Sequence, residues 1–294
     1  MVMLESYAVP NATDTAVCLC YFSAVGYNRP RENFMKVKSM LDRARIPVFT
    51  AECIIGNTPQ LIPNPTILVR SNSALFYKEQ LFNMLEFQIP RQYKNLVFMD
   101  SDIIFSEPDW VDRISLALKS YSIIQPFSKV VFTNASLEPM EPALPSAIKR
   151  FKERNMINGH PGFCWAILRS QFRAMGRFFD KAIIGSGDTL FANSVMKMNV
   201  AFTYEFIYRD YAQWRFRTSV VPVSVTYLDM TIYHLYHGDL KSRQYASRHK
   251  IPQLQKIKTW DQAVYTNKDG MYELKDRTVN NIFKQYFLSR KEDD

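Results

Sequence analysis

Two carboxylates lie one residue apart in Asp100-Ser101-Asp102, directly after the apolar run Asn95–Met99. Oxygen ligands suit Mg²⁺ and Mn²⁺, and proteins commonly share these ions with substrate phosphates. A second apolar run, Ile103–Phe105, follows the pair. The carboxylates are therefore expected at the end of a buried strand, where an unpaired charge is costly and a cation is a natural partner. A solvated turn is the alternative, because Asp-x-Asp is a common tripeptide.

Two of the four histidines, His234 and His237, lie close together in the sequence and are followed by Gly238. A neutral imidazole can complete a metal shell, and a glycine permits close approach of the backbone. Side chains alternate along a strand, so His234 is expected on one face while His237 lies at the turn beyond it. The predicted metal ligands are Asp100, Asp102 and His237, with His234 as the alternative to His237. Hydrogen-bonded histidines of the core or surface are the other interpretation.

Basic side chains near these motifs could neutralise a leaving diphosphate. Lys241 and Arg243 follow the histidines, and Lys78 lies on a predicted helix that precedes the acidic pair. For a lone lysine such as Lys78, a solvated helix face is the other interpretation. A nucleotide is expected across the ends of the first strands, where its predicted contacts are Asp100, Ser101, Tyr21, Phe22, Glu52 and Arg70.

The candidate catalytic carboxylate is Asp188, which follows the turn Gly185-Ser186-Gly187. At a helix start its charge is stabilised by the helix dipole. It could accept a proton from an acceptor hydroxyl or bind a sugar hydroxyl, and a helix N-cap is the other interpretation. The predicted acceptor-binding residues are Gly187, Asp188, His160 and Trp165, although Trp165 could instead belong to a core strand.

The first 105 residues alternate between strand and helix patterns. A helix is expected after Pro30, and a second one after an N-cap at Ser71-Asn72-Ser73. Such alternation predicts a mostly parallel sheet with helices on its faces, which binds ligands at the carboxyl ends of its strands. The acidic motif lies at such an end. Apolar runs predict the strands over residues 16–22, 48–55, 66–69 and 95–99.

The rest of the chain is less regular. Residues 137–145 contain three prolines and predict a loop. With no internal repeat, a single domain over residues 1–294 is expected, with a nucleotide-binding half near residues 16–125 and an acceptor-binding half near residues 126–294. Helices are expected over residues 110–120, 188–198, 204–218, 239–250 and 280–294, and strands over residues 122–125, 163–168, 220–227 and 230–236.

Composition narrows the class of protein. The chain has 294 residues, of which 47% are apolar and 22% charged, as is typical of a globular protein. Its net charge of +9 favours a small anionic substrate over nucleic acid, since the basic residues are dispersed. No apolar run is long enough to predict a membrane span, and the N-terminus lacks the pattern of a signal peptide. Four cysteines in apolar runs predict buried free thiols and a reducing, cytoplasmic compartment.

The order of the motifs resembles that of GT-A glycosyltransferases of large DNA viruses, notably chloroviruses, and of bacterial relatives. Met99, Ser101 and Tyr236 depart from the residues usual at those places. The blocks that carry the resemblance span about residues 16–294 and include Lys78-Glu79, Ile89-Pro90, Asp100-Ser101-Asp102-Ile103, His160-Pro161-Gly162-Phe163-x-Trp165-Ala166, Gly185-Ser186-Gly187-Asp188, His234-x-x-His237-Gly238-Asp239 and the tail 290–294.

The resemblance implies a GT-A fold, which is a Rossmann-like, mostly parallel central sheet flanked by helices, with an elaborated C-terminal acceptor-side region. It implies a nucleotide-diphosphate-sugar donor, with UDP-hexose favoured, and Mn²⁺ or Mg²⁺ at the Asp-x-Asp motif. It also implies transfer to a glycan hydroxyl. Some members of the family look like galactosyltransferases that act on viral capsid glycans, which would place this protein in the host cytoplasm.

Two other functions fit parts of the pattern. A sugar nucleotidyltransferase would also use paired carboxylates and a parallel sheet, but it should have a Gly-rich N-terminal loop, and residues 23–28 hold only Gly26. A basic nucleic-acid-binding protein should gather its basic residues on one face, and it would leave the acidic motif unexplained.

Overall fold

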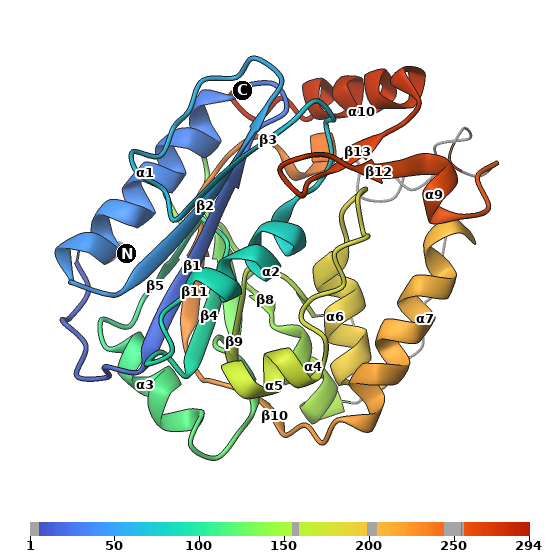
Figure 1. The fold of residues 1–294 in the computed structure, drawn as a ribbon. Helices are drawn as coiled ribbons and strands as arrows, with labels where there is room; N and C mark the ends of the chain where they lie inside the picture. Colours follow the sequence, from blue (N-terminus) through green and yellow to red (C-terminus); the bar gives the residue numbers. More distant parts are fainter. Residues whose placement is uncertain (1–5, 155–158, 199–204, 244–253, 255) are drawn as a thin grey trace.

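A seven-stranded sheet lies at the centre of the protein (Figure 1). The computed structural model describes residues 6–154, 159–198, 205–243, 254 and 256–294. The strand order is β10-β6-β9-β4-β1-β2-β3, and every neighbouring pair is parallel except those of β9, which is antiparallel to β4 and β6. The predicted mostly parallel sheet is therefore confirmed. Its strands are β1 Thr15–Phe22, β2 Val48–Ile55, β3 Ile67–Ser71, β4 Asn95–Met99, β6 Ile123–Gln125, β9 Cys164–Leu168 and β10 Val225–Tyr227.

Helices cover both faces of this sheet, because its strands are apolar on both sides (Figure 1). Successive residues of β1 enter two different cores. Val17 and Leu19 pack in the core under α1 and α3, whereas Cys18 packs in the core under α2, α5 and α6. The helices are α1 Asn28–Arg43, α2 Lys78–Gln88, α3 Trp110–Ala117, α4 Ala147–Arg154, α5 Arg169–Ala174, α6 Gly187–Val195 and α7 Glu205–Val220.

The motif Asp100-Ser101-Asp102 links the central sheet to a second sheet of four strands, in the order β5-β11-β7-β8. Strand β4 ends just before the motif and β5 begins just after it. Strand β5 pairs antiparallel with β11, which lies parallel to β7. The motif is thus a short connection between buried strands of two sheets. The new strands are β5 Ile103–Phe105, β7 Lys129–Phe132, β8 Leu144–Pro145 and β11 Thr231–His234.

The C-terminal part of the chain covers the β3 edge of the central sheet. The side chain of Asn267 donates a hydrogen bond to the Arg70 carbonyl, and Asp269 accepts one from the Arg70 N–H group. The Ser73 hydroxyl accepts a hydrogen bond from Leu274 N–H. This part consists of α9 Trp260–Ala263, β12 Val264–Thr266, β13 Tyr272–Leu274 and α10 Arg277–Ser289.

Several of the expected helix boundaries are wrong. The run Ser71-Asn72-Ser73 caps no helix, because its polar groups bind β13 and α10, and α2 begins later at Lys78. Helix α10 begins early, at Arg277, and ends at Ser289, so residues 290–294 form a tail. Of the helix expected over residues 239–250, the structure describes a short 3₁₀ turn, η1 Leu240–Arg243, and the later residues lie outside its description.

The four cysteines are buried and free, as expected. None of the helices in the described part of the chain combines the length and the apolar character that a membrane span needs.

A buried carboxylate, Glu86, ties α2 to α5. It is fully buried and accepts hydrogen bonds from the guanidinium groups of Arg169, Arg173 and Arg177, which lower its pKa against the effect of desolvation. Arg169 also donates to the carbonyls of Glu86 and Ile89 at the end of α2, where the helix leaves carbonyls unpaired. The cluster therefore fixes the helix whose first residue, Lys78, pairs with Asp100 of the acidic motif.

We predict that Glu86→Ala lowers the free energy of unfolding by about 3–5 kcal/mol, because it leaves the buried Arg169 without its anion. Urea denaturation of the two proteins measures this difference. Asp109→Asn is the control, since it removes an exposed ion pair with Arg113 and should change stability by at most about 1 kcal/mol. Equal effects of the two substitutions would contradict a structural role for Glu86.

Candidate metal centre and cleft

The carboxylate of Asp102 faces the imidazoles of His234 and His237. Its Oδ2 atom lies 3.0 Å from Nε2 of His237 and 3.6 Å from Nε2 of His234. Both histidines are buried, whereas the Asp102 side chain is 21% exposed. Within the described part of the chain, these three residues form the cluster whose donor atoms are close enough together to hold a metal ion.

Pairing between β5 and β11 brings these residues together from distant parts of the chain. His234, the last residue of β11, lies opposite Ile103, the first residue of β5. The next residue, Leu235, donates its N–H to the carbonyl of Asp102 at 2.7 Å. The strand register thus places His234 next to Asp102, and the turn after β11 returns His237 to the same carboxylate.

The donor atoms fit a divalent cation. Octahedral Mg²⁺ holds its ligands at about 2.0–2.1 Å, so neighbouring ligand atoms lie about 3.0 Å apart. The separations of 3.0 and 3.6 Å around Asp102 are close to this spacing. Imidazole nitrogens suit transition metals better than Mg²⁺, which favours Mn²⁺ for a set of one carboxylate and two histidines. The sequence pattern left His234 and His237 as alternatives, whereas the structure brings both to Asp102.

The cluster opens into a cleft whose empty space, which continues into open solvent, is about 1230 Å³. Its walls come from the ends of β1 and β4, the start of α2, the turn before α6, and the chain after α10. Of the residues singled out from the sequence, the cleft is lined by Tyr21, Phe22, Lys78, Asp100, Ser101, Asp102, His160, Gly187, Asp188, His234 and His237.

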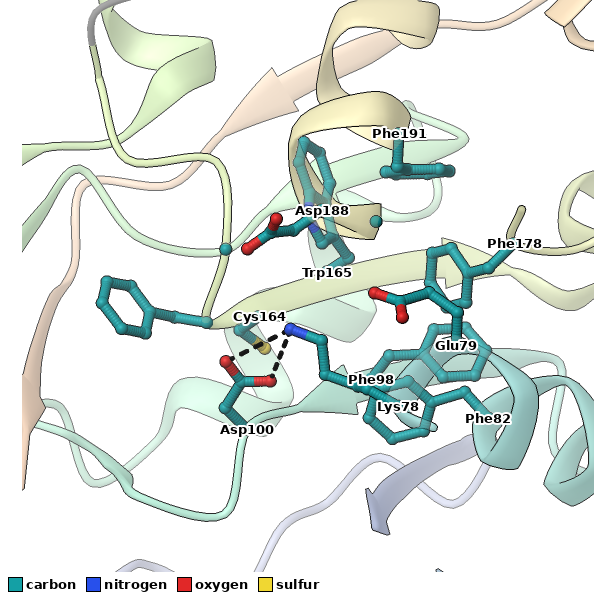
Figure 2. A pocket seen from close by; sticks show the side chains of 13 residues that line it. Lys78, Glu79, Phe82, Phe98, Asp100, Cys164, Trp165, Phe178, Asp188 and Phe191 are labelled. Carbon is teal, nitrogen blue, oxygen red and sulfur yellow. Dashed lines mark hydrogen bonds and ion pairs between the residues drawn. The ribbon is translucent and has the colours of Figure 1, made fainter. Parts of the chain in front are cut away.

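Asp100 is not part of the Asp102 cluster and pairs with Lys78 instead (Figure 2). The Lys78 ammonium lies 3.2 Å from Oδ1 of Asp100. Burial raises the pKa of Asp100 to about 6, although the ammonium opposes this shift. Desolvation lowers the pKa of Lys78, but the neighbouring carboxylates outweigh it and hold that pKa well above its ordinary value. The structure therefore places the predicted metal ligand Asp100 in an ion pair.

The residue opposite Asp100 has a strained backbone. Phe163 has φ of +76°, a conformation that bulky residues rarely adopt and that costs about 1–3 kcal/mol. Its carbonyl accepts a hydrogen bond from Asp100 N–H at 2.7 Å, and its ring stacks on His160 with centroids 3.9 Å apart. The hydrogen bond fixes the backbone beyond β4, and the ring stacking holds His160 at the wall of the cleft.

A smaller recess adjoins the cleft and is shown in Figure 2. Lys78, Glu79 and Asp188 stand at its mouth, where Figure 2 draws their charged groups around a common space. Desolvation raises the pKa of Glu79 to about 7, although the Lys78 charge opposes this. Asp100 also lines the recess, and its apolar part is lined by Phe82, Phe98, Trp165, Phe178 and Phe191.

Asp188, the candidate catalytic residue, lies in the first turn of α6 and lines both the cleft and the recess. Its Oδ1 accepts a hydrogen bond from Thr189 N–H at 2.7 Å. Trp165 is 4% exposed and donates its ring N–H to the Pro161 carbonyl, so it belongs mainly to the core. It lines the recess but not the cleft.

Several residues that were predicted to contact the nucleotide or its diphosphate do not line the cleft. The buried carboxylate of Glu52 accepts hydrogen bonds from Leu61 N–H and Ile62 N–H and so holds the loop before β3. Arg70 lies at the β3 edge under the C-terminal hairpin. Lys241 is 84% exposed and pairs with Asp239. The side chain of Arg243 lies outside the part of the chain that the structure describes.

Phe76, Arg290 and Glu292 also line the cleft, and the sequence pattern indicated no role for them. The Arg290 guanidinium lies 5.6 Å from the centre of the Phe76 ring and 2.5 Å from a carboxylate oxygen of Glu292. The tail, residues 290–294, was part of the resemblance. Nothing in its composition indicated that α10 would end at Ser289 and leave these residues to line the cleft.

No family model and no curated protein matches the sequence. Among solved structures, the catalytic domain of Drosophila beta1,4galactosyltransferase 7 with xylobiose is similar over 92% of this chain and 98% of its own, with 10% identity and a TM-score of 0.41. A variant of that enzyme with manganese, UDP-Gal and xylobiose is similar over 92% and 74%, with 10% identity and a TM-score of 0.38.

The 4-diphosphocytidyl-2C-methyl-D-erythritol synthase of Anaerococcus prevotii is similar over 84% of this chain and 93% of its own, with 10% identity and a TM-score of 0.35. Identities and TM-scores this low do not assign a function. The function of this chain has to be inferred from the geometry of its site.

The raised pKa of Glu79 predicts a pH-dependent stability. Between about pH 4.5 and the folded-state pKa of about 7, the unfolded chain releases its proton while the folded protein keeps it. Relative to Glu79→Gln, the wild type should therefore lose stability as the pH rises from about 5 to about 8, by at most about 3 kcal/mol. Urea denaturation of both proteins at the two pH values measures this, and a constant difference would contradict the raised pKa.

Gly187 leaves room for Glu79, because a Cβ atom there would overlap the Glu79 carboxyl group. We predict that Gly187→Ala lowers the free energy of unfolding by about 1–3 kcal/mol. In a Glu79→Ala background the same substitution should cost less than about 0.5 kcal/mol, because the overlap is gone. A double-mutant cycle by urea denaturation measures the difference, and equal costs in both backgrounds would show that the overlap is not the cause.

Proposed function

We propose that this chain is a metal-dependent glycosyltransferase of the GT-A type, which moves a sugar from a nucleotide-diphosphate donor to a glycan hydroxyl. The observation that carries the proposal is the cluster of Asp102, His234 and His237 at the carboxyl end of β4, facing a cleft lined by aromatic, basic and acidic side chains. A solvated turn would not bring two buried histidines to one carboxylate.

In this proposal, Asp102, His234 and His237 hold Mn²⁺ or Mg²⁺. The ion supplies Lewis-acid charge stabilisation to the leaving diphosphate, which is worth several kcal/mol in enzymes of this kind. Among the described residues that line the cleft, the cations are Lys78, which was predicted, and Arg290, which takes the part that Lys241 was predicted to play. A guanidinium suits this part, because its fixed donors match phosphate oxygens.

The donor nucleoside is proposed to contact Tyr21, Phe22 and Ser101, which lie at the ends of β1 and β4 in the same cleft. Aromatic faces of this kind suit a nucleobase. The choice of UDP-hexose as donor, and of a viral capsid glycan as acceptor in the host cytoplasm, follows the resemblance in motif order and is proposed on that basis.

In the transfer, the bond between the anomeric carbon and the diphosphate oxygen breaks, and its electron pair leaves with the diphosphate. The acceptor oxygen bonds to the anomeric carbon and loses its proton. If the reaction inverts the anomeric centre, Asp188 accepts that proton. If the reaction retains it, the departing diphosphate oxygen accepts that proton and Asp188 orients the acceptor. His160 and Gly187 border the same part of the cleft, and Trp165 the adjoining recess, where they are proposed to contact the sugars.

We predict that Asp102→Asn lowers sugar transfer at least about 100-fold, because the ligand that both histidines share loses its charge. A thermal-shift assay provides the binding readout. UDP should raise the melting temperature of the wild type when Mn²⁺ is present and not in EDTA, and this increase should vanish in Asp102→Asn.

Asp239→Asn is the matched control, because it neutralises an exposed carboxylate two residues beyond His237 and should keep activity and the UDP-dependent shift. Full turnover of Asp102→Asn in EDTA would contradict the proposal. Release of pyrophosphate from UTP and a sugar 1-phosphate, without sugar transfer, would identify a nucleotidyltransferase instead.

A further inference from the structure

The tail, residues 290–294, lies beside the Asp102 cluster and is held by hydrogen bonds to the start of α1 and to Tyr236. The carboxylate of Asp293 accepts hydrogen bonds from Asn28 N–H and Arg29 N–H at the start of α1. The Tyr27 hydroxyl accepts one from Lys291 N–H, and the Tyr236 hydroxyl donates one to the Asp294 carbonyl. Helix starts have unpaired N–H groups and favour negative charge, so the start of α1 stabilises the Asp293 carboxylate and with it the position of the tail.

Gly238 permits the tail to approach the metal cluster closely. Its φ is +82°, and a Cβ atom on it would lie 2.5 Å from the Lys291 carbonyl oxygen. Any side chain at this position would push the tail away from His237, which precedes the glycine. The backbone after the histidines is therefore shaped to receive the tail.

Glu292 then reaches the side of the His237 ring opposite Asp102. Its Oε1 atom lies 3.2 Å from Nδ1 of His237, while Nε2 of the same ring lies 3.0 Å from Asp102. The Glu292 side chain is 11% exposed, and the Arg290 guanidinium lies 2.5 Å from the same Oε1 atom. Arg290, Glu292, His237 and Asp102 thus form one chain of contacts that runs from the tail to the metal cluster.

We propose that the C-terminal tail is part of the metal centre and that Glu292 is a positioning residue for His237. Glu292 accepts the Nδ1–H group of His237, which leaves the Nε2 lone pair directed at the ion, and Arg290 holds the carboxylate in place. The inference rests on the proposed function insofar as it takes the Asp102 cluster to hold a divalent cation. Histidine ligands commonly need such a partner, and its loss weakens metal binding about 10–100-fold.

The test measures Mn²⁺ affinity of the full-length protein by the electron paramagnetic resonance signal of free Mn²⁺. Glu292→Ala should bind Mn²⁺ about 10–100-fold more weakly than the wild type. Glu292→Gln should fall between the two, because an amide oxygen still accepts from Nδ1–H but carries no charge. Lys291→Ala is the matched control and should bind as the wild type does, since its side chain is 66% exposed.

A second measurement separates positioning from folding. Urea denaturation without metal should show that Glu292→Gln is fully folded under the conditions of the Mn²⁺ titration, so that its weaker Mn²⁺ binding cannot come from unfolding. Wild-type affinity in both Glu292 variants would overturn the inference and leave the proposed function standing. Absence of Mn²⁺ binding in the wild type itself would overturn both.

Discussion

Antiparallel pairing of β5 with β11 is the contact on which the candidate metal centre depends. The pair joins residues that are some 130 positions apart and sets His234 opposite Ile103, beside Asp102. A slip of one residue would turn His234 to the other face of its strand. Strand β5 has three residues, so its position is held by packing, and Ile103, Ile104 and Phe105 are all fully buried. The core beneath the second sheet therefore determines where the candidate metal ligands meet.

The charges in the cleft explain why a cation belongs there. Among its described lining residues, the carboxylates are Glu79, Asp100, Asp102, Asp188 and Glu292, and the cations are Lys78 and Arg290. A donor diphosphate would meet net negative charge in this cleft, which a divalent cation at Asp102 reduces. Lys78 is engaged by Asp100, and Arg290 contacts Glu292, so each cation also orders a carboxylate near the site.

Local patterns predicted much of the fold, because the elements of the first half are long and strongly apolar. Strands β2 and β4 begin and end where expected, and the acidic motif follows β4. No strand was predicted at β7, or at β5 despite its apolar run, because the stability of these short strands comes from pairing across the chain. For the same reason, sequence spacing placed a phosphate-binding cation at Lys241, next to the histidines, whereas the structure brings Arg290 to the cleft. Distant contacts of this kind leave no periodic pattern to detect.

The proposed chemistry requires one divalent cation between Asp102 and two histidines in the donor cleft. Anomalous X-ray scattering at the manganese edge, from crystals grown with Mn²⁺ and UDP, would locate that ion. We expect a single strong peak within about 2.0–2.3 Å of the Asp102 carboxylate and of Nε2 of His234 and His237, with the diphosphate on its open side. A peak elsewhere, with Asp102 bound to no ion while UDP occupies the cleft, would show that the metal centre is assigned wrongly.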